Sequence, residues 1–306
     1  MKDECKIPNI RGEVYKFIKT SYTGGAVDIY KPYGKKVYRY DVNSLYPYIM
    51  ANNPLPVGQP TLLELDYNRI ENIINDQTKF SFVEVEVECP STIKAPLLLT
   101  RINNKTIAPV GKWQGIYTSI EIQRAIELGY KFKYYRCIYF KSEIIFKDYV
   151  DFYYNMKKNN DKNSSAYVIS KLMLNSLYGR FGVSPYLDKH IIINSKDLVD
   201  LSEKENITNV LSLSQDKELV SYQSNLQIEI ENNNTLCNIA IAAAVTAGAR
   251  VFRSKFKNMP EYTLYYSDTD SIDIDKPLPE EYVGNELGQF KLEDIFDEAV
   301  YLAPKM

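Results

Sequence analysis

Alternating apolar and polar positions predict several strands in this chain. Between Phe82 and Glu88, valines alternate with glutamates, as in a half-buried strand with one charged face. A second alternating run would place Asp41 at the end of a strand, on the face that it shares with Val37. That strand would end before Pro47, which is suited to open a short helix. An acid at such a strand end can bind a ligand, although a solvated acid is the commoner arrangement.

Helical signals appear in two further segments. Thr118 and Glu121 have the spacing of a capping box, and Gly129 would end the helix that they open. From Leu236 to about Phe256 the residues are unusually small, which allows a helix to pack closely against a sheet.

A third helix is predicted where three polar side chains recur at i, i+4 and i+7. Lys171, Asn175 and Tyr178 would line one face of this helix, and Gly179 and Gly182 supply stops. A cation, an amide and a phenol in one row would suit a phosphate, a sugar and a base edge. The alternative is an ordinary amphipathic helix with a solvated lysine.

The segment 264–275 predicts a β-hairpin with two carboxylates, Asp268 and Asp270, at its tip. Two anions held close repel each other, and burying either one alone is costly. A divalent cation would relieve that cost. Because the ligands are oxygen atoms and no Cys or His lies nearby, Mg²⁺ or Mn²⁺ is favoured over zinc.

Three other interpretations of this hairpin compete. Acids are common in turns, so the pair can be a solvated acidic turn. A calcium loop fails the spacing test, since Ile272 and Asp273 stand where that pattern needs Asp or Asn and then Gly. The DxD element of sugar-nucleotide glycosyltransferases, which also holds a metal, is not excluded by the hairpin alone.

Together these elements resemble motifs A, B and C of family B DNA polymerases. The patterns DxxSLYP, KxxxNSxYG and YxDTDS begin at Asp41, Lys171 and Tyr266, complete and in the family's order. They are most similar to the protein-primed branch of bacteriophages, adenoviruses and linear plasmids of fungal mitochondria. A glycosyltransferase would explain neither of the first two motifs.

The resemblance implies an α+β fold: a polymerase palm, which is an antiparallel sheet with packed helices, plus helical fingers and two insertions. It divides the chain into a first palm part with a YxGG element and motif A at 1–60, a first insertion of the priming-protein-contacting type at 61–148, fingers with motif B at 149–182, a second insertion at 183–234, and a second palm part with motif C at 235–306.

The resemblance also assigns the catalytic residues. Asp41 and Asp270 would be shared ligands of two Mg²⁺ ions, with Mn²⁺ possible, and Asp268 would support them. The backbone carbonyl of Val42 would be a further metal ligand. Tyr46 lies where the family's steric gate excludes a 2′-hydroxyl, which favours deoxynucleotides. The dNTP-binding set is Tyr46, Lys171, Asn175, Tyr178 and Lys157, the last being either a second triphosphate contact or a solvated cation.

Three weaker elements are similar to DNA-binding motifs of the family. The YTGG sequence at 22–25 resembles the YxGG element that touches the template strand, and 246–250 resembles the Tx2[AG]R element that binds primer–template. The segment 303–305 resembles the approach to the KxY motif. The implied DNA-binding residues are Tyr22, Gly24, Gly25, Thr246, Arg250, Thr269 and Lys305.

Composition narrows the picture further. With 306 residues and 45% hydrophobic content the chain is long enough for one or two domains with a real core. Its net charge of −2 excludes a generally basic nucleic-acid coat protein, so any phosphate-binding site must be local. A candidate site, which can equally be a solvated helix face, is the cluster Arg250, Arg253, Lys255 and Lys257. The 26 tyrosines, with frequent Asn, Lys and Ile, indicate an AT-rich coding sequence.

The four cysteines form no CxxC pair, and His190 is the only histidine, which argues against a zinc site. Reduced buried thiols are therefore expected at Cys5, Cys89, Cys137 and Cys237. No apolar run reaches the length of about 20 residues that a membrane span needs. The acidic N-terminus does not resemble a mitochondrial presequence. We expect a protein encoded by a mitochondrial genome or plasmid, or otherwise associated with a virus or plasmid, and not secreted.

Two hypotheses of different class remain. The first is a DNA-directed DNA polymerase core whose partners are primer–template DNA, dNTPs and a terminal (priming) protein. The second is a catalytically idle polymerase remnant that only binds DNA. Only 40 residues precede Asp41, so an N-terminal exonuclease domain is expected to be missing, as is a C-terminal thumb. The sequence leaves the oligomeric state open.

Overall fold

The computed structural model describes residues 7–64, 66–103, 105–184, 188–223 and 238–305. The chain forms two compact units, one made of Met1–Gly182 with Asn238–Met306 and the other of Val183–Cys237. Leu236, Cys5 and Cys237 lie outside the described residues.

An antiparallel sheet of five strands carries the predicted acidic positions. Its order is β1-β12-β13-β2-β14, so β13 lies between β12 and β2. The strands are β1 (Val27–Ile29), β2 (Tyr33–Val42), β12 (Leu264–Asp268), β13 (Ser271–Ile274) and β14 (Phe290–Val300). A short 3-10 helix, Glu280–Tyr282, precedes β14.

A second antiparallel sheet has the order β3-β8-β4-β7. Its strands are β3 (Leu55–Glu64), β4 (Lys79–Cys89), β7 (Gly111–Thr118) and β8 (Lys131–Glu143). Helices α3 (Tyr67–Asn75) and α4 (Ser119–Glu127) pack on it, and β5 (Thr100–Ile102) pairs with β6 (Lys105–Ile107). The valines predicted to face inward on β4 are fully buried in its core.

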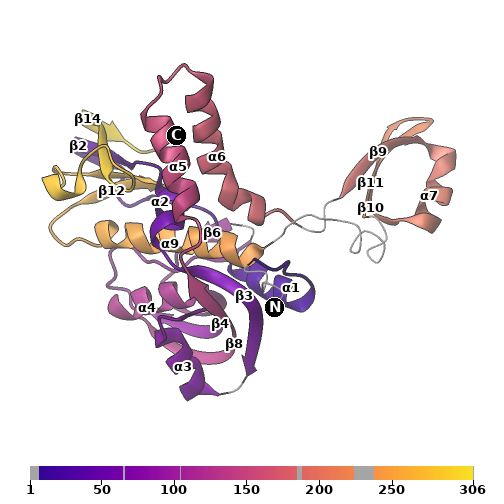
Figure 1. Ribbon diagram of the computed structural model, residues 1–306, viewed down its shortest axis with the longest axis horizontal. Coiled ribbons are helices and arrows are strands. Elements are labelled where there is room, and N and C mark those ends of the chain that lie inside the picture. The colour runs from indigo at the N-terminus through magenta and orange to yellow at the C-terminus, as the bar shows by residue number, and fades with distance from the viewer. Residues whose placement is uncertain (1–6, 65, 104, 185–187, 224–237, 306) are drawn as a thin grey trace. The chain divides into compact units, whose positions relative to one another are not determined.

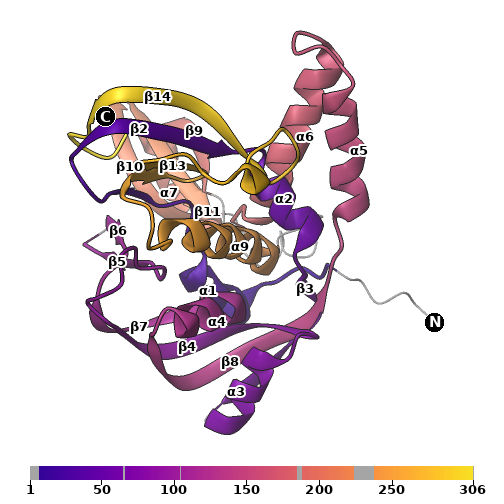
Figure 2. The ribbon, with the colours of Figure 1, turned by 90° about the vertical axis from the view of Figure 1, so that its left-hand side faces the viewer.

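Helix α9 (Ile239–Lys257) lies between these two sheets, as Figure 2 shows. Nearly all of its side chains are buried, and Gly248 leaves no room for a Cβ beside Ile49. The small residues are therefore needed because the helix is packed on both sides, which confirms the predicted helix and explains its composition. Helix α1 (Gly12–Ser21) packs against α9 and β7.

A pair of helices, α5 (Lys147–Lys158) and α6 (Ser165–Phe181), stands beside α2 (Leu45–Asn52), as Figure 1 shows. Helix α6 continues through Gly179 and ends at Gly182, so the predicted stop at Gly179 is wrong. Helix α2 begins at Leu45, so Pro47 stands at its third position and does not open it. Proline is tolerated there because the first N–H groups of a helix lack intrahelical partners.

The unit Val183–Cys237 has a three-stranded antiparallel sheet of order β10-β11-β9. Its elements are β9 (Lys189–Asn194), a 3-10 helix (Ser195–Asp197), α7 (Leu198–Lys204), β10 (Asn206–Ser214) and β11 (Lys217–Gln223).

In the other unit, strand β3 crosses the predicted domain boundary between residues 60 and 61, since the strand continues through an irregularity between Val57 and Thr61.

Within the described residues, no helix is long and apolar enough to cross a membrane.

Candidate active site

The predicted β-hairpin is confirmed. Strands β12 and β13 pair in register with Asp268 opposite Ser271, and Thr269 and Asp270 form the turn between them. Thr269 has a φ of 41°, a conformation that a β-branched residue rarely adopts. The Thr269 N–H donates a hydrogen bond of 3.1 Å to the carbonyl of Ala26, which ties the tip to the neighbouring loop.

The sheet brings Asp41 beside Asp270. Asp41 pairs with Ser271 across β2 and β13, and the Val42 N–H donates to the Asp270 carbonyl at 3.1 Å. Burial, followed by repulsion from Asp270 and Glu293, raises the pKa of Asp41 to about 6. Burial also raises the pKa of Asp270. Two carboxylates from distant parts of the sequence therefore share one partly buried, electronegative site.

Asp268 faces a different neighbour. Its carboxylate accepts a hydrogen bond from the Thr269 hydroxyl at 3.0 Å and pairs with the Lys305 ammonium group at 3.7 Å. Its charge also contributes to the raised pKa of Asp270. Lys305, predicted as a DNA contact, thus lies next to the hairpin, with its side chain 67% exposed.

The donor set at Asp41 and Asp270 fits a hard divalent cation. In the part of the chain that the structure describes, the Asp41 carboxylate makes no ion pair or hydrogen bond with another residue. Partly buried oxygen ligands without a partner are the environment that Mg²⁺ or Mn²⁺ would stabilise. Two carboxylates are fewer than a closed protein site needs, and no group of three metal-ligating side chains occurs among the described residues. The remaining ligands would have to come from water, backbone or substrate.

The other acids of this region have structural partners. Asp273 is fully buried and accepts two hydrogen bonds from Arg39, at 2.9 and 2.7 Å, and one from the Tyr301 hydroxyl at 2.6 Å. The Asp275 carboxylate accepts from the Thr263 N–H at 2.8 Å. Since these acids do not converge with Asp268 and Asp270, the geometry also argues against a calcium loop.

Side chains from α2 and α6 meet next to the acidic pair. The rings of Tyr46 and Tyr178 lie 4.3 Å apart at an angle of 31°. Burial raises the pKa of both phenols, and for Tyr46 the neighbouring Tyr178 and Asp270 add to this effect. Both phenols therefore stay protonated at neutral pH and present hydroxyl donors near Asp270.

Two lysines approach from the helix pair. Lys157 on α5 donates a hydrogen bond of 3.3 Å to the Ser44 hydroxyl. Burial and the nearby positive charge of Lys171 lower the pKa of Lys157. Two cations in such proximity would be stabilised by an anion between them, so Lys157 belongs to the candidate site together with Lys171. Asn175 is exposed on the same helix as Lys171.

The loop 22–25 packs directly against the hairpin tip. A Cβ on Gly25 would overlap the Thr269 side chain, whereas a Cβ on Gly24 would meet nothing within 4 Å. Tyr22 lies against Gly182, where a Cβ would be 2.8 Å from the phenol oxygen. Glycine at position 25 is thus required by the close approach of loop and hairpin.

Arg250 and Thr246, predicted to bind DNA, are buried in α9. The Arg250 guanidinium donates to Glu121 at 2.9 and 2.8 Å, and to the carbonyls of Thr23 and Gly24. Thr246 donates to the Ala243 carbonyl at 3.1 Å. Direct contact with DNA needs a side chain at the surface, whereas Arg250 and Thr246 are buried because α9 is packed on both sides. Arg250 instead holds the loop 22–25 in place.

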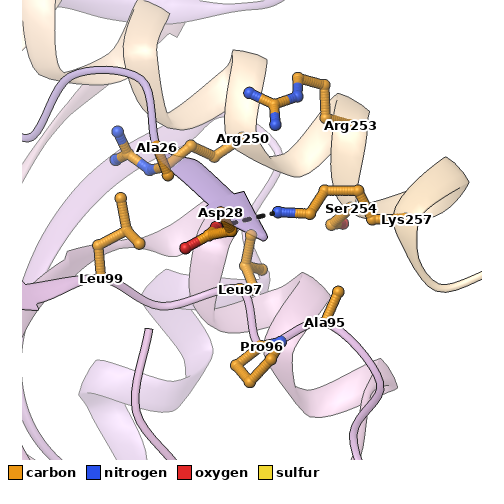
Figure 3. A pocket seen from close by; sticks show the side chains of 10 residues that line it. All are labelled: Ala26, Asp28, Ala95, Pro96, Leu97, Leu99, Arg250, Arg253, Ser254 and Lys257. Atoms are coloured by element: carbon orange, nitrogen blue, oxygen red, sulfur yellow. Dashed lines mark ion pairs between the residues drawn. The ribbon is translucent and has the colours of Figure 1, made fainter. Parts of the chain in front are cut away.

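The predicted phosphate-binding cluster is also corrected by burial. Arg253 and Lys257 are 4% and 7% exposed, and of this cluster only Lys255 is exposed. Lys257 pairs with Asp28 at 3.6 Å in a pocket between α9 and strand β1, shown in Figure 3. Burial, followed by repulsion from Arg253, lowers the pKa of Lys257 to about 8. Arg253 and Lys257 are therefore internal and do not form a solvated face, whereas Lys255 is solvated.

Sequence reasoning missed Glu121 as a partner of Arg250. Its place in the capping box is as predicted, since Glu121 accepts from the Thr118 N–H at 3.2 Å and the Thr118 hydroxyl at 2.8 Å. The sequence offered no signal for this pair, because only the folded structure shows that Glu121 is fully buried and therefore needs a cation.

Comparison with known proteins gives one family. The sequence matches the family model for DNA polymerase type B, organellar and viral, over residues 1–261. It is 36% identical over 312 residues to a probable DNA polymerase of Neurospora intermedia and 34% identical over 314 residues to one of Ascobolus immersus. Both alignments cover 99% of this chain, but only 32% and 25% of these relatives.

Solved structures give the same fold. Phi29 DNA polymerase complexed with primer-template DNA matches with a TM-score of 0.76 and 22% identity, covering 99% of this chain and 50% of that chain. Its ternary complex with primer-template DNA and incoming nucleotide substrates matches with a TM-score of 0.75 and 21% identity, over 99% and 51%. The predicted α+β fold with an antiparallel sheet is thereby confirmed.

Proposed function

The chain belongs to the organellar and viral type B DNA polymerases, and from that premise we propose that it is the core of a DNA-directed DNA polymerase. It would transfer a deoxynucleotide to a primer 3′-hydroxyl, directed by a template strand, with release of pyrophosphate. The observation that carries this proposal is the approach of Asp41 and Asp270, two half-buried carboxylates from opposite ends of the chain.

Asp41 and Asp270 would hold two Mg²⁺ ions, or Mn²⁺, with the Val42 carbonyl as a further ligand and Asp268 in support. Such ions, when bound, stabilise the attacking and leaving oxygens of an in-line displacement. The two acids supply the negative charge that keeps divalent cations there, and their partial burial strengthens the attraction between the charges.

The lysines would bind the triphosphate. Lys157 and Lys171 come from different helices and are close enough for the charge of one to lower the pKa of the other. A triphosphate between them would neutralise both, and the Lys171 ammonium group would donate a proton to the leaving pyrophosphate.

The phenols would shape the nucleotide pocket. Tyr46 and Tyr178 are in ring contact, so Tyr46 is held rigidly and would exclude a 2′-hydroxyl. Asn175 would line the same pocket. Thr269 at the hairpin tip, Lys305 beside it and the loop residues Tyr22, Gly24 and Gly25 would contact DNA, and Arg250 would support that loop from within α9. Thr246, whose hydroxyl bonds within α9, would act only through the packing of that helix.

The remaining segments would serve a protein-primed polymerase. The segment 61–148 would contact a terminal protein, and 183–234 would encircle DNA. The genome replicated would be a linear plasmid, viral or organellar DNA, with mitochondria as the proposed location. The matched relatives, which are probable DNA polymerases of fungi and a DNA polymerase of a Bacillus phage, support the plasmid or viral association. The chain spans less than a third of the fungal relatives cited above.

Primer extension tests the proposal. The purified chain is mixed with a recessed primer–template, four dNTPs and Mg²⁺, beside Asp270→Asn and a matched control, Asp297→Asn, which changes an exposed acid on β14. We expect extension by the wild type and the control but not by Asp270→Asn. Extension that survives Asp270→Asn would overturn the site assignment. DNA binding without extension by any variant would favour a fragment, or an idle remnant, that does not synthesise DNA by itself.

A further inference from the structure

Arg253 is a buried cation that contacts the hairpin directly. It lies on α9 with 4% of its surface exposed, and its guanidinium donates hydrogen bonds to the Thr269 carbonyl and the Ser267 hydroxyl. One planar group therefore links the end of β12 to the turn. Figure 3 shows Arg253 on the same helix as Lys257, and of the two only Lys257 is joined to Asp28 by an ion pair.

The residue that Arg253 holds is the one between the two acids. Thr269 has a left-handed backbone conformation that costs energy for a β-branched residue and persists only where the surroundings fix it. Three contacts fix it: the Ala26 carbonyl accepts its N–H, Gly25 packs against its side chain, and Arg253 binds its carbonyl. Of these three contacts, only the one from Arg253 is to the Thr269 carbonyl. The orientation of this peptide group sets the position of the next residue, Asp270.

We propose that Arg253 is a positioning residue for the metal-binding hairpin: by clamping Thr269 and Ser267, it fixes the placement of Asp270 relative to Asp41. This inference rests on the proposed function, because it concerns the same site. Arg253 reaches the acids only through the backbone of the turn and is not itself a catalytic residue. Residues that orient metal ligands in this way change metal affinity by about 10- to 100-fold when they are removed.

Lys257 is the matched control within the same helix. It lies one turn further along α9, is also buried, and pairs with Asp28 and the ring of Tyr30. Among the described residues, it makes no hydrogen bond or ion pair with the hairpin turn. Replacing it removes a buried cation and a packing side chain, as replacing Arg253 does, without releasing the turn.

The experiment compares Arg253→Met, Arg253→Lys and Lys257→Met in the full chain. Hydrogen exchange measures the amides of residues 264–275, and electron paramagnetic resonance measures Mn²⁺ affinity, with Asp270→Asn as the site control. We expect Arg253→Met to speed exchange at Thr269 and Asp270 by tenfold or more and to weaken Mn²⁺ binding by at least tenfold. Arg253→Lys should recover part of both effects, and Lys257→Met should lower thermal stability while changing neither.

Three results would overturn the inference. Exchange at the turn that is the same in Arg253→Met and Lys257→Met would reduce Arg253 to a packing role. Tighter Mn²⁺ binding by Arg253→Met would show that its charge repels the metal more than its hydrogen bonds organise the site. A failure of Arg253→Lys to recover either effect would exclude the clamp. If the wild type binds Mn²⁺ no better than Asp270→Asn, the proposed metal site fails, and hydrogen exchange alone then decides the role of Arg253.

Discussion

The buried pair between Glu121 and Arg250 makes a quantitative prediction. The side chains are 1% and 7% exposed, and the guanidinium donates to the carboxylate at 2.8 and 2.9 Å. In Glu121→Gln the amide keeps the size of the side chain and the capping-box spacing, but the charge is lost. Arg250 then remains buried without a counter-charge, and breaking such a pair costs about 3–5 kcal/mol. Because glutamine retains an acceptor oxygen, we expect the free energy of unfolding to fall by about 3 kcal/mol.

Urea unfolding measures this loss. Trp113, the only tryptophan of the chain, lies on β7 in the sheet next to α4, so its fluorescence reports on this region. Glu88→Gln is the control, because Glu88 pairs with Lys112 at 3.4 Å while both side chains stay about half exposed or more. Exposed pairs of this kind contribute at most about 1 kcal/mol.

The outcome also separates charge from packing. A double replacement of Glu121 and Arg250 by methionine should recover most of the lost stability, because apolar residues of similar volume often replace a buried pair without cost. If Glu121→Gln lowers the free energy of unfolding no more than Glu88→Gln does, the reasoning is refuted, because the buried Arg250 would then need no counter-charge. Because Arg250 also donates to the carbonyls of Thr23 and Gly24, DNA binding should weaken in Glu121→Gln as well.

Three further predictions concern the site. Burial and repulsion raise the pKa of Asp41 to about 6, above its unfolded value of about 3.9, so its ionisation lowers the stability of the fold as pH rises from about 4 to 6. In EDTA, Asp41→Asn should therefore raise the melting temperature at pH 7.5 but not at pH 3.5. An equal gain at both pH values would contradict this. Gly25→Ala should lower primer extension at least tenfold, and by more than Gly24→Ala, where a Cβ meets no protein atom within 4 Å. Equal losses would exclude the close approach of Gly25 to the hairpin. Lys157→Met should raise the KM for dNTPs about tenfold. The control Lys158→Met, which changes an exposed lysine paired with Glu286, should leave the KM unchanged. An unchanged KM in both variants would remove Lys157 from the triphosphate site.

Local patterns were sufficient for the hairpin, the capping box and the strand before Asp41. Each depends on residues within a few positions of one another, where alternation, turn residues and capping spacing decide the conformation. The three motifs likewise identified the family, which the comparisons confirm. Where a local pattern was wrong, as at Gly179, the helix continued because packing of α6 against α5 outweighed the weak helix propensity of glycine.

The sequence by itself determined the family and the candidate residues for the chemistry, since Asp41, Asp268 and Asp270 lie in short motifs whose spacing is local. Only the tertiary structure decided what the basic residues of α9 do. In sequence, Arg250, Arg253 and Lys257 recur at helical spacing like any solvated cationic face. They are buried because two sheets cover α9 from opposite sides, and each cation therefore had to find an internal partner. Burial depends on elements far apart in the chain, and the periodicity of one helix does not record it.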